Sequence, residues 1–215
     1  MEIHIILMYS LFYLGMLAFF FYSISLFKHY NQTAGEREEA TDKKVSIIIP
    51  AYNEEPSIGK TIESALAVDY PDKNLEIIVV DDGSKDNTYK EAKRFAKLDN
   101  VFVYYKKNGG KGGAINYGLK KVTGEIIITM DADSFVHPDA VKKMVARFDD
   151  PEVMCVSPSM LVYDPRTIWQ KISHAEYFIG IFLRKAFSTV NSIHITPGAF
   201  SSYRKEFFDK YGGFD

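Results

Sequence analysis

Two aspartates that follow a largely apolar run carry the strongest chemical signal in this sequence. Asp131 and Asp133 flank Ala132, directly after residues 125–130. Two carboxylates placed two residues apart, where a buried strand runs out into a loop, can both turn toward one cation. Oxygen ligands of this kind suit Mg²⁺ or Mn²⁺ that bridges a diphosphate. An acidic turn or a helix cap is the alternative, because such pairs are common by chance.

Three other loops carry groups that could bind parts of a nucleotide. In the segment 81–84, a carboxylate such as Asp82 can accept the N–H of a base edge, although Asp-Gly is also an ordinary turn dipeptide. Lys111 lies in a run of glycines, 109–113, that resembles a phosphate-binding loop without the Walker or dinucleotide spacing, so a flexible turn is equally open. The third segment, 50–55, contains Tyr52 and Glu54.

Each of these loops follows a short apolar run, and the runs indicate the elements that must position them. Strands are expected at 45–49, 75–80, 101–105, 125–130 and 153–157, with amphipathic helical stretches between them. This alternation predicts an α/β fold with a mostly parallel sheet flanked by helices. Ligands of such sheets bind beyond the carboxyl ends of the strands, so we expect the loops to converge on one crevice.

The chain after Pro165 has a different pattern. Ile168, Ile172 and Ile179 lie near helical spacing in one long stretch, which is either buried or rests against lipid. Burial against the sheet is the favoured interpretation, because Glu176 interrupts the apolar side. The segment 196–204 could close the binding crevice from the other side, with a plain Pro-Gly turn as the alternative.

The first thirty residues differ in kind from the rest. No charged residue occurs from Ile5 to Phe27, a stretch of roughly 34 Å as a helix, which is enough to cross a bilayer core. A cleaved signal peptide is disfavoured because the stretch is too long and lacks a basic start. Basic residues after the span, beginning with Lys28, place the following domain in the cytoplasm. We expect a transmembrane anchor at 1–29, a polar linker at 30–44 and an α/β domain at 45–215.

The composition narrows the classes of protein to which the chain can belong. Of 215 residues, 47% are hydrophobic and 25% are charged, which is typical of a globular domain. The net charge of −2 offers no broad basic field, so a nucleic-acid partner is not expected. The single cysteine, Cys155, excludes an intrachain disulfide, and the five histidines show no zinc-binding pattern.

Taken together, the segments 45–54, 81–84 and 131–133 resemble glycosyltransferase family 2, the inverting enzymes with the GT-A (Rossmann-like) fold. Lys111 and the segments 196–204 and 212–215 are most similar to the membrane-bound processive synthases of poly-N-acetylglucosamine, hyaluronan and chitin. The resemblance implies a nucleotide-sugar site at Pro50, Ala51, Tyr52, Glu54, Asp82, Lys111, Asp131 and Ala132, and a metal site for Mg²⁺ or Mn²⁺ at Asp131 and Asp133. It places Gly198, Tyr203 and Arg204 on the acceptor side.

The same resemblance implies a membrane enzyme that transfers a sugar, N-acetylglucosamine or a related hexose, from a UDP-sugar to a growing glycan or a lipid-linked acceptor. The general base and a Gln-x-x-Arg-Trp motif of such enzymes are expected beyond Asp215, so the domain is expected to be incomplete at its C-terminus. One alternative is therefore an inactive fragment that binds a nucleotide-sugar or a partner chain. A dinucleotide-binding domain ranks last, because no Gly-x-Gly-x-x-Gly follows the first strand.

Overall fold

The structure, a computed structural model, describes residues 2–33, 42–190, 192–193 and 196–214. The chain divides into two compact units. The sheet unit comprises residues 38–158 and 196–215, and the helical unit comprises residues 1–37 and 159–195. The long stretch after Pro165 thus belongs with the N-terminal helix.

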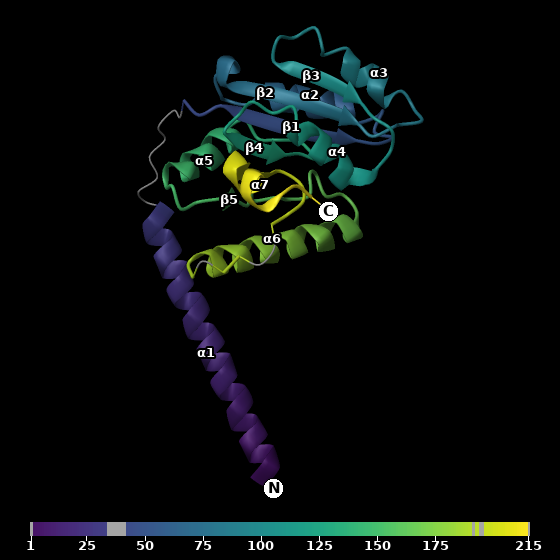
Figure 1. Ribbon diagram of the computed structural model, residues 1–215. Helices are drawn as coiled ribbons and strands as arrows, with labels where there is room; N and C mark the ends of the chain where they lie inside the picture. The colour runs from purple at the N-terminus through teal and green to yellow at the C-terminus, as the bar shows by residue number, and fades with distance from the viewer. Residues whose placement is uncertain (1, 34–41, 191, 194–195, 215) are drawn as a thin grey trace. The chain divides into compact units, whose positions relative to one another are not determined.

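The described part of the sheet unit forms one six-stranded sheet in the order β3-β2-β1-β4-β6-β5 (Figure 1). Its strands are β1 (Val45–Ala51), β2 (Leu75–Asp81), β3 (Val101–Tyr105), β4 (Ile126–Thr129), β5 (Cys155–Val156) and β6 (Ser201–Arg204). The first four run parallel, whereas β6 is antiparallel to both β4 and β5. The expected mostly parallel α/β sheet is confirmed. The strand β6 was missed, since its residues were interpreted as a loop closing the site.

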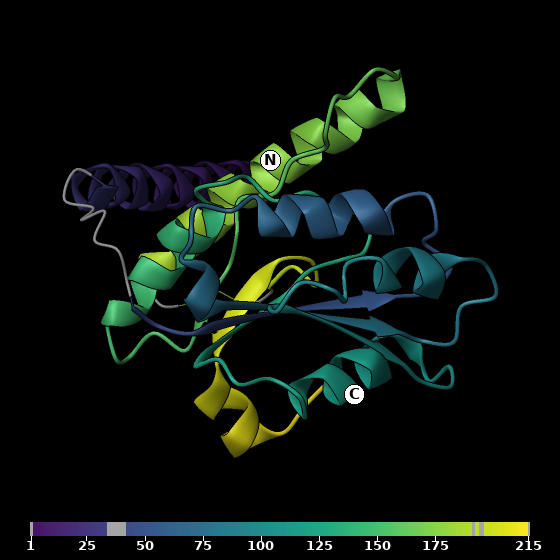
Figure 2. The same ribbon diagram turned by 90° about the horizontal axis from the view of Figure 1, so that it is seen from above.

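Helices cover both faces of the sheet (Figure 2). They are α2 (Ile58–Leu66), α3 (Thr88–Lys93), α4 (Gly110–Leu119), α5 (Ala140–Ala146) and α7 (Lys205–Tyr211), with short 3₁₀ turns η1 (Asp72–Asn74) and η2 (Arg147–Asp149). Ile47 and Ile49 pack into the core beneath α2, α3 and α5, whereas Ile48 packs into the core beneath α4. Because side chains alternate along a strand, this division requires an unbroken apolar run.

The arrangement of β1 and β4 fixes where a ligand can bind. These two strands are neighbours, and the chain proceeds from β1 outward to β2 and β3 before it returns to β4 on the other side. In open parallel sheets, such a reversal of strand order leaves a crevice beyond the carboxyl ends of the strands. Ala51 pairs with Asp81, so the loops after β1 and β2 begin at the same level, whereas Thr129 pairs with Ile48, so the loop after β4 begins three residues lower along β1.

The helical unit contains α1 (Glu2–Thr33) and α6 (Ile168–Ser188). Within residues 3–28 of α1, a stretch of 18 residues has a mean hydropathy of 2.0, and none of that stretch is buried. This segment is long and apolar enough to cross a membrane. The helix α6 begins at a capping box formed by Thr167 and Gln170. Our expectation that α6 is buried against the sheet is wrong, because Ala186 is its one buried residue.

Gly124, in the turn before β4, provides a test of the packing beside β1. A Cβ atom there would lie 2.5 Å from Ser46 Oγ and 2.9 Å from the backbone oxygen of Lys44. We expect Gly124→Ala to lower the free energy of unfolding by about 1–3 kcal/mol, since backbone must move to relieve the overlap. Gly59→Ala is the matched control, because Gly59 lies in α2 with nothing within 4 Å of an added methyl group, and alanine favours a helix. Urea unfolding of the full chain in detergent gives the unfolding midpoint of each variant. Equal midpoints for the two variants would contradict the packing argument.

Candidate functional site

A cleft of about 350 Å³ opens beyond the carboxyl ends of the parallel strands. It is lined by residues from the loops after β1, β2, β3 and β4: Pro50, Ala51, Tyr52, Glu54, Asp82, Asn108, Gly110, Lys111, Ala114, Asp131, Ala132 and Asp133. The structure thus brings together all the residues that the sequence suggested for a nucleotide-sugar and a metal. A volume of this size lies at the lower end of the range for small-molecule sites.

The loop after β1 is held in shape by the loop after β2. Asn53 adopts a left-handed backbone conformation with φ of 55°, which is uncommon for a residue other than glycine. Its backbone N–H donates to Ser84 Oγ at 3.0 Å, and its side-chain oxygen accepts from the backbone N–H of Lys85 at 2.8 Å. The backbone N–H of Glu54 donates to Thr88 Oγ1 at 2.7 Å. These bonds present Tyr52, which is 41% exposed, at the cleft.

Asp82 is a buried carboxylate with fixed partners. Its side chain is 4% exposed, and Lys106 Nζ donates to its Oδ1. The backbone N–H of Gly109 donates to the same oxygen at 3.0 Å and to Oδ2 at 3.2 Å. Two lone-pair positions per oxygen leave Oδ2 with acceptor capacity for a ligand N–H. The preceding Asp81 accepts from the backbone of the turn and shapes it.

Lys111 stands in the first turn of α4, opposite the acidic loop. Its Nζ lies 2.5 Å from Asp131 Oδ1, although this ion pair lacks the geometry of a hydrogen bond. The two side chains are 50% and 30% exposed, so solvent screens the pair and its contribution to stability is small. The first turn of α4 also presents backbone N–H groups and the positive end of the helix dipole to this side of the cleft.

The loop after β4 carries the predicted metal ligands. Thr61 Oγ1 donates to the backbone oxygen of Ala132 at 2.7 Å, and this bond anchors the loop to α2. Asp131 is half-buried and Asp133 is exposed. No group of three or more histidine, cysteine or acidic side chains that could hold a metal ion occurs in the part of the chain that the structure describes. Two carboxylates fit a cation that takes its other ligands from phosphate and water, which is the usual arrangement for Mg²⁺.

The residues predicted for the acceptor side do not line this cleft. Gly198 comes nearest, since a Cβ atom there would lie 3.7 Å from Lys111 Nζ. Tyr203 packs against Phe207, Phe208 and Phe214, and burial raises the pKa of its hydroxyl.

Arg204 is bound to backbone oxygens of a neighbouring segment. Its guanidinium donates to the backbone oxygens of Phe148, Asp150 and Val153, at distances of 2.7–2.8 Å. These bonds hold the segment between α5 and β5. A role for Gly198, Tyr203 or Arg204 in acceptor binding stays a prediction.

A family model described as glycosyl transferase family 2 matches residues 46–212, which include the whole cleft and, apart from Val45, all the strands of the described sheet. The chain belongs to this family. The membership agrees with the resemblance that the spacing of the three motifs indicated.

Curated relatives of this family 2 chain include poly-beta-1,6-N-acetyl-D-glucosamine synthases. The protein from Staphylococcus epidermidis is 31% identical over 175 residues, covering 80% of this chain and 42% of the relative. A protein of the same name from Staphylococcus aureus is 30% identical over 165 residues, covering 75% of this chain and 39% of the relative. The chain therefore spans less than half the length of these relatives.

Solved structures of glycosyltransferases share the fold, which confirms the GT-A expectation. The mannosyltransferase PcManGT from Pyrobaculum calidifontis, in complex with GDP-Man and Mn²⁺, has a TM-score of 0.68 at 26% identity, covering 91% of this chain and 56% of that one. Residues 1–349 of S. aureus TarS have a TM-score of 0.61 at 26% identity, covering 77% of this chain and 48% of that one.

Several residues of the cleft escaped the sequence analysis of this family 2 domain. Asn108 and Ala114 line the cleft but were not proposed as binding residues, and Gly110 was considered only as part of the glycine run 109–113. Lys106 was missed as the partner of Asp82, 24 residues earlier in the chain. One signal was available for Lys106 and Asn108, because they follow a strand end in the same way as the residues that were recognised. Pairing between two loops carries no such signal.

Proposed function

We propose that this chain forms the donor-binding part of a metal-dependent inverting glycosyltransferase. It would bind a UDP-sugar, with N-acetylglucosamine or a related hexose as the sugar, for transfer to a growing glycan or a lipid-linked acceptor. The observation that carries the proposal is that Asp82, Lys111, Asp131 and Asp133 line one cleft. A buried acceptor for a base, a cation for a diphosphate and two carboxylates for a metal together match the parts of a nucleotide-sugar.

The nucleobase would occupy the end of the cleft at Asp82 and Tyr52. Asp82 offers a carboxylate oxygen with free acceptor capacity, and a uracil base presents one N–H on its pairing edge. Tyr52 is exposed enough to stack on a flat ring. Because Lys106 and Gly109 hold the carboxylate in place before the ligand arrives, little side-chain freedom is lost on binding.

The diphosphate would occupy the end at Lys111, where the first turn of α4 also favours anions. Lys111 would exchange its ion pair with Asp131 for contacts with phosphate oxygens. Asp131 and Asp133 would hold Mg²⁺ or Mn²⁺, and the cation would neutralise charge on the leaving nucleoside diphosphate. Pairing of Lys111 with Asp131 keeps both groups at the cleft until then.

The relatives support the ligand class. PcManGT is described with GDP-Man and Mn²⁺, and TarS is described with UDP-GlcNAc and with UDP. The S. epidermidis relative is named as a synthase of an N-acetylglucosamine polymer. We extend these ligands to this chain as part of the proposal. We also propose that α1 anchors the protein in the cell membrane with the sheet unit in the cytoplasm, because Lys28, Lys43 and Lys44 follow the apolar segment.

Calorimetric titration of the full chain in detergent tests the donor proposal. We expect UDP-N-acetylglucosamine to bind in the presence of Mn²⁺ and to bind at least tenfold more weakly after the metal is removed with EDTA, as loss of a charge-stabilising ligand predicts. GDP-mannose and dTDP-glucose serve as the comparison donors. Absence of metal-dependent binding for all three would overturn the proposal.

A further inference from the structure

The helix α6 presents a broad apolar face to its surroundings. Ile168 is 66% exposed, Ile172 is 45% exposed and Ile179 is 58% exposed, and the spacing of four and seven residues places them in one stripe. Trp169, which is 74% exposed, and Phe178, which is 65% exposed, flank the stripe on either side. An exposed surface of this kind on a folded chain marks a contact with another molecule or with lipid.

The other side of α6 is partly covered by its own chain. His174 Nδ1 lies 3.3 Å from the backbone oxygen of Val162, so the segment that leads into the helix returns along that side. His174 is about 140° around the helix from Ile179, at 100° per residue. The apolar stripe therefore points away from the segment that packs on α6.

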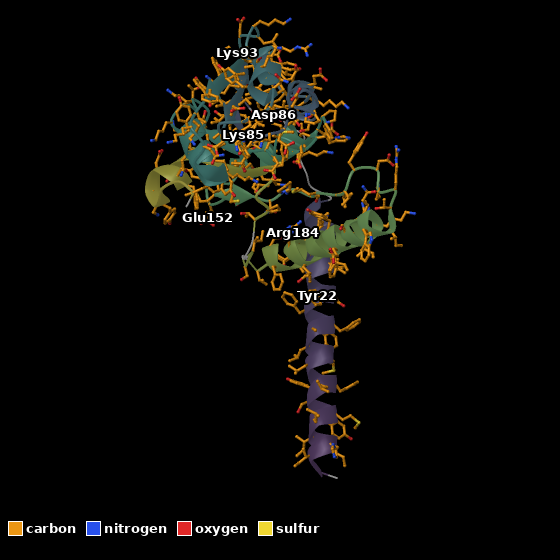
Figure 3. The ribbon with its side chains drawn as sticks, turned by 90° about the vertical axis from the view of Figure 1, so that its right-hand side faces the viewer. Tyr22, Lys85, Asp86, Lys93, Glu152 and Arg184 are labelled. Atoms are coloured by element: carbon orange, nitrogen blue, oxygen red, sulfur yellow. The ribbon has the colours of Figure 1, made fainter. Side chains whose placement is uncertain are left out.

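The end of α6 is fixed at one level of α1. The ring centroids of Phe187 and Phe21 are 6.0 Å apart, and those of Phe182 and Tyr22 are 5.5 Å apart. Lys28 Nζ donates to the backbone oxygen of Thr189 at 2.9 Å. These residues of α1 lie in the last two turns of its apolar segment, 3–28, where a membrane-spanning helix would leave the hydrocarbon. From there α6 extends across the direction of α1 (Figures 1 and 3).

The net charge of α6 and of the residues that lead into it favours an anionic surface. Residues 164–188 contain four basic side chains against two acidic ones: Arg166, Lys171, Arg184 and Lys185, and Asp164 and Glu176. Lys28 adds a further positive charge at the junction with α1. Basic side chains beside an apolar helix face are typical of helices that lie in the headgroup region of anionic bilayers.

We propose that α6 is an interfacial helix that lies in the plane of the membrane, with the stripe of Ile168, Ile172 and Ile179 in the headgroup and acyl boundary. The surface that this stripe contacts is a bilayer that contains anionic phospholipid. This inference rests on the proposed membrane placement of α1, because continuity with α1 sets the depth of α6. It goes beyond donor binding, since it gives the chain a second contact with the membrane beside the anchor.

Trp169 is the single tryptophan of the chain and reports on α6 directly. The full chain is reconstituted into vesicles of phosphatidylcholine and phosphatidylglycerol, with and without lipids brominated near the top of the acyl chains. We expect blue-shifted emission and strong quenching by the brominated lipids, as for an indole in the interface. Co-flotation with the vesicles reports on α1 separately. Flotation with water-like, unquenched emission would overturn the role of α6 and leave the anchor intact, and loss of flotation would refute the placement of α1.

A pair of matched variants separates the apolar stripe from the rest of the helix. Ile179→Glu places a charge in the stripe, and Tyr177→Glu places the same charge about 200° around the helix. We expect the first to cut the quenching of Trp169 at least twofold and the second to leave it nearly unchanged. Equal effects would overturn the proposal. Quenching that is insensitive to both, together with chemical crosslinking between copies, would assign the stripe to a second copy of the chain.

Discussion

Affinity for a UDP-sugar in the presence of Mn²⁺ should fall by at least about tenfold when Asp133 is replaced by asparagine. Loss of a group that only orients a metal ligand typically costs about 10–100-fold in metal affinity. Loss of the charged ligand itself should cost at least as much metal affinity. Asparagine has nearly the same shape as aspartate, and Asp133 is exposed, so the fold should be unaffected. Titration of UDP-N-acetylglucosamine in Mn²⁺ measures the change.

Asp99→Asn is the matched control, because it removes the same charge from an exposed turn outside the cleft. We expect its affinity to equal that of the unaltered chain. The residual binding of Asp133→Asn should also equal the binding that the unaltered chain shows in EDTA. An Asp133→Asn chain that still responds to Mn²⁺ as the unaltered chain does would exclude this carboxylate from the metal site.

The parts of the site that could be predicted from sequence share one physical origin. A strand buried on both faces must be apolar throughout, as β1 is from Ile47 to Ile49, so the first polar residues after it mark the edge of the sheet. Parallel strands bring those edges together, which is why the loops after β1, β2 and β4 could be assigned to one cleft from sequence. Local patterns thus predicted which residues meet.

The parts that could not be predicted depend on pairings between distant segments. The strand β6 contains Ser201 and Ser202, which are fully buried between β4 and β5, and a Ser-Ser-Tyr-Arg segment gives no strand-like apolar pattern. The pairing of Asp82 with Lys106 arises from two loops that meet in space. The exposure of α6 was mispredicted because amphipathic spacing identifies an apolar face without identifying what covers it.

The buried pair of Asp82 and Lys106 leads to the second large effect, a change in base preference. Uracil presents an N–H at position 3, whereas neutral cytosine has an acceptor nitrogen there, which a carboxylate repels. A hydrogen bond to a charged group contributes about 1.5–3 kcal/mol, or roughly 10–150-fold in affinity. Asp82→Asn should therefore weaken the binding of UDP by at least about tenfold. An amide can donate to cytosine, so the preference for UDP over CDP should shrink further.

Stability must be separated from recognition in this experiment, because Asp82→Asn leaves the ammonium of Lys106, 18% exposed, without its partner. Breaking a buried pair in this way costs about 3–5 kcal/mol, reduced here by the partial exposure of the lysine. A double variant that also carries Lys106→Met lacks this unpaired ammonium, and it should regain most of the lost stability. The double variant should keep the altered ratio of UDP to CDP affinity, because that ratio follows from residue 82 alone. Lys106→Met by itself should keep the UDP preference, since Asp82 retains its bond from the backbone of Gly109. A UDP preference that survives in the double variant would show that the base is recognised elsewhere in the cleft.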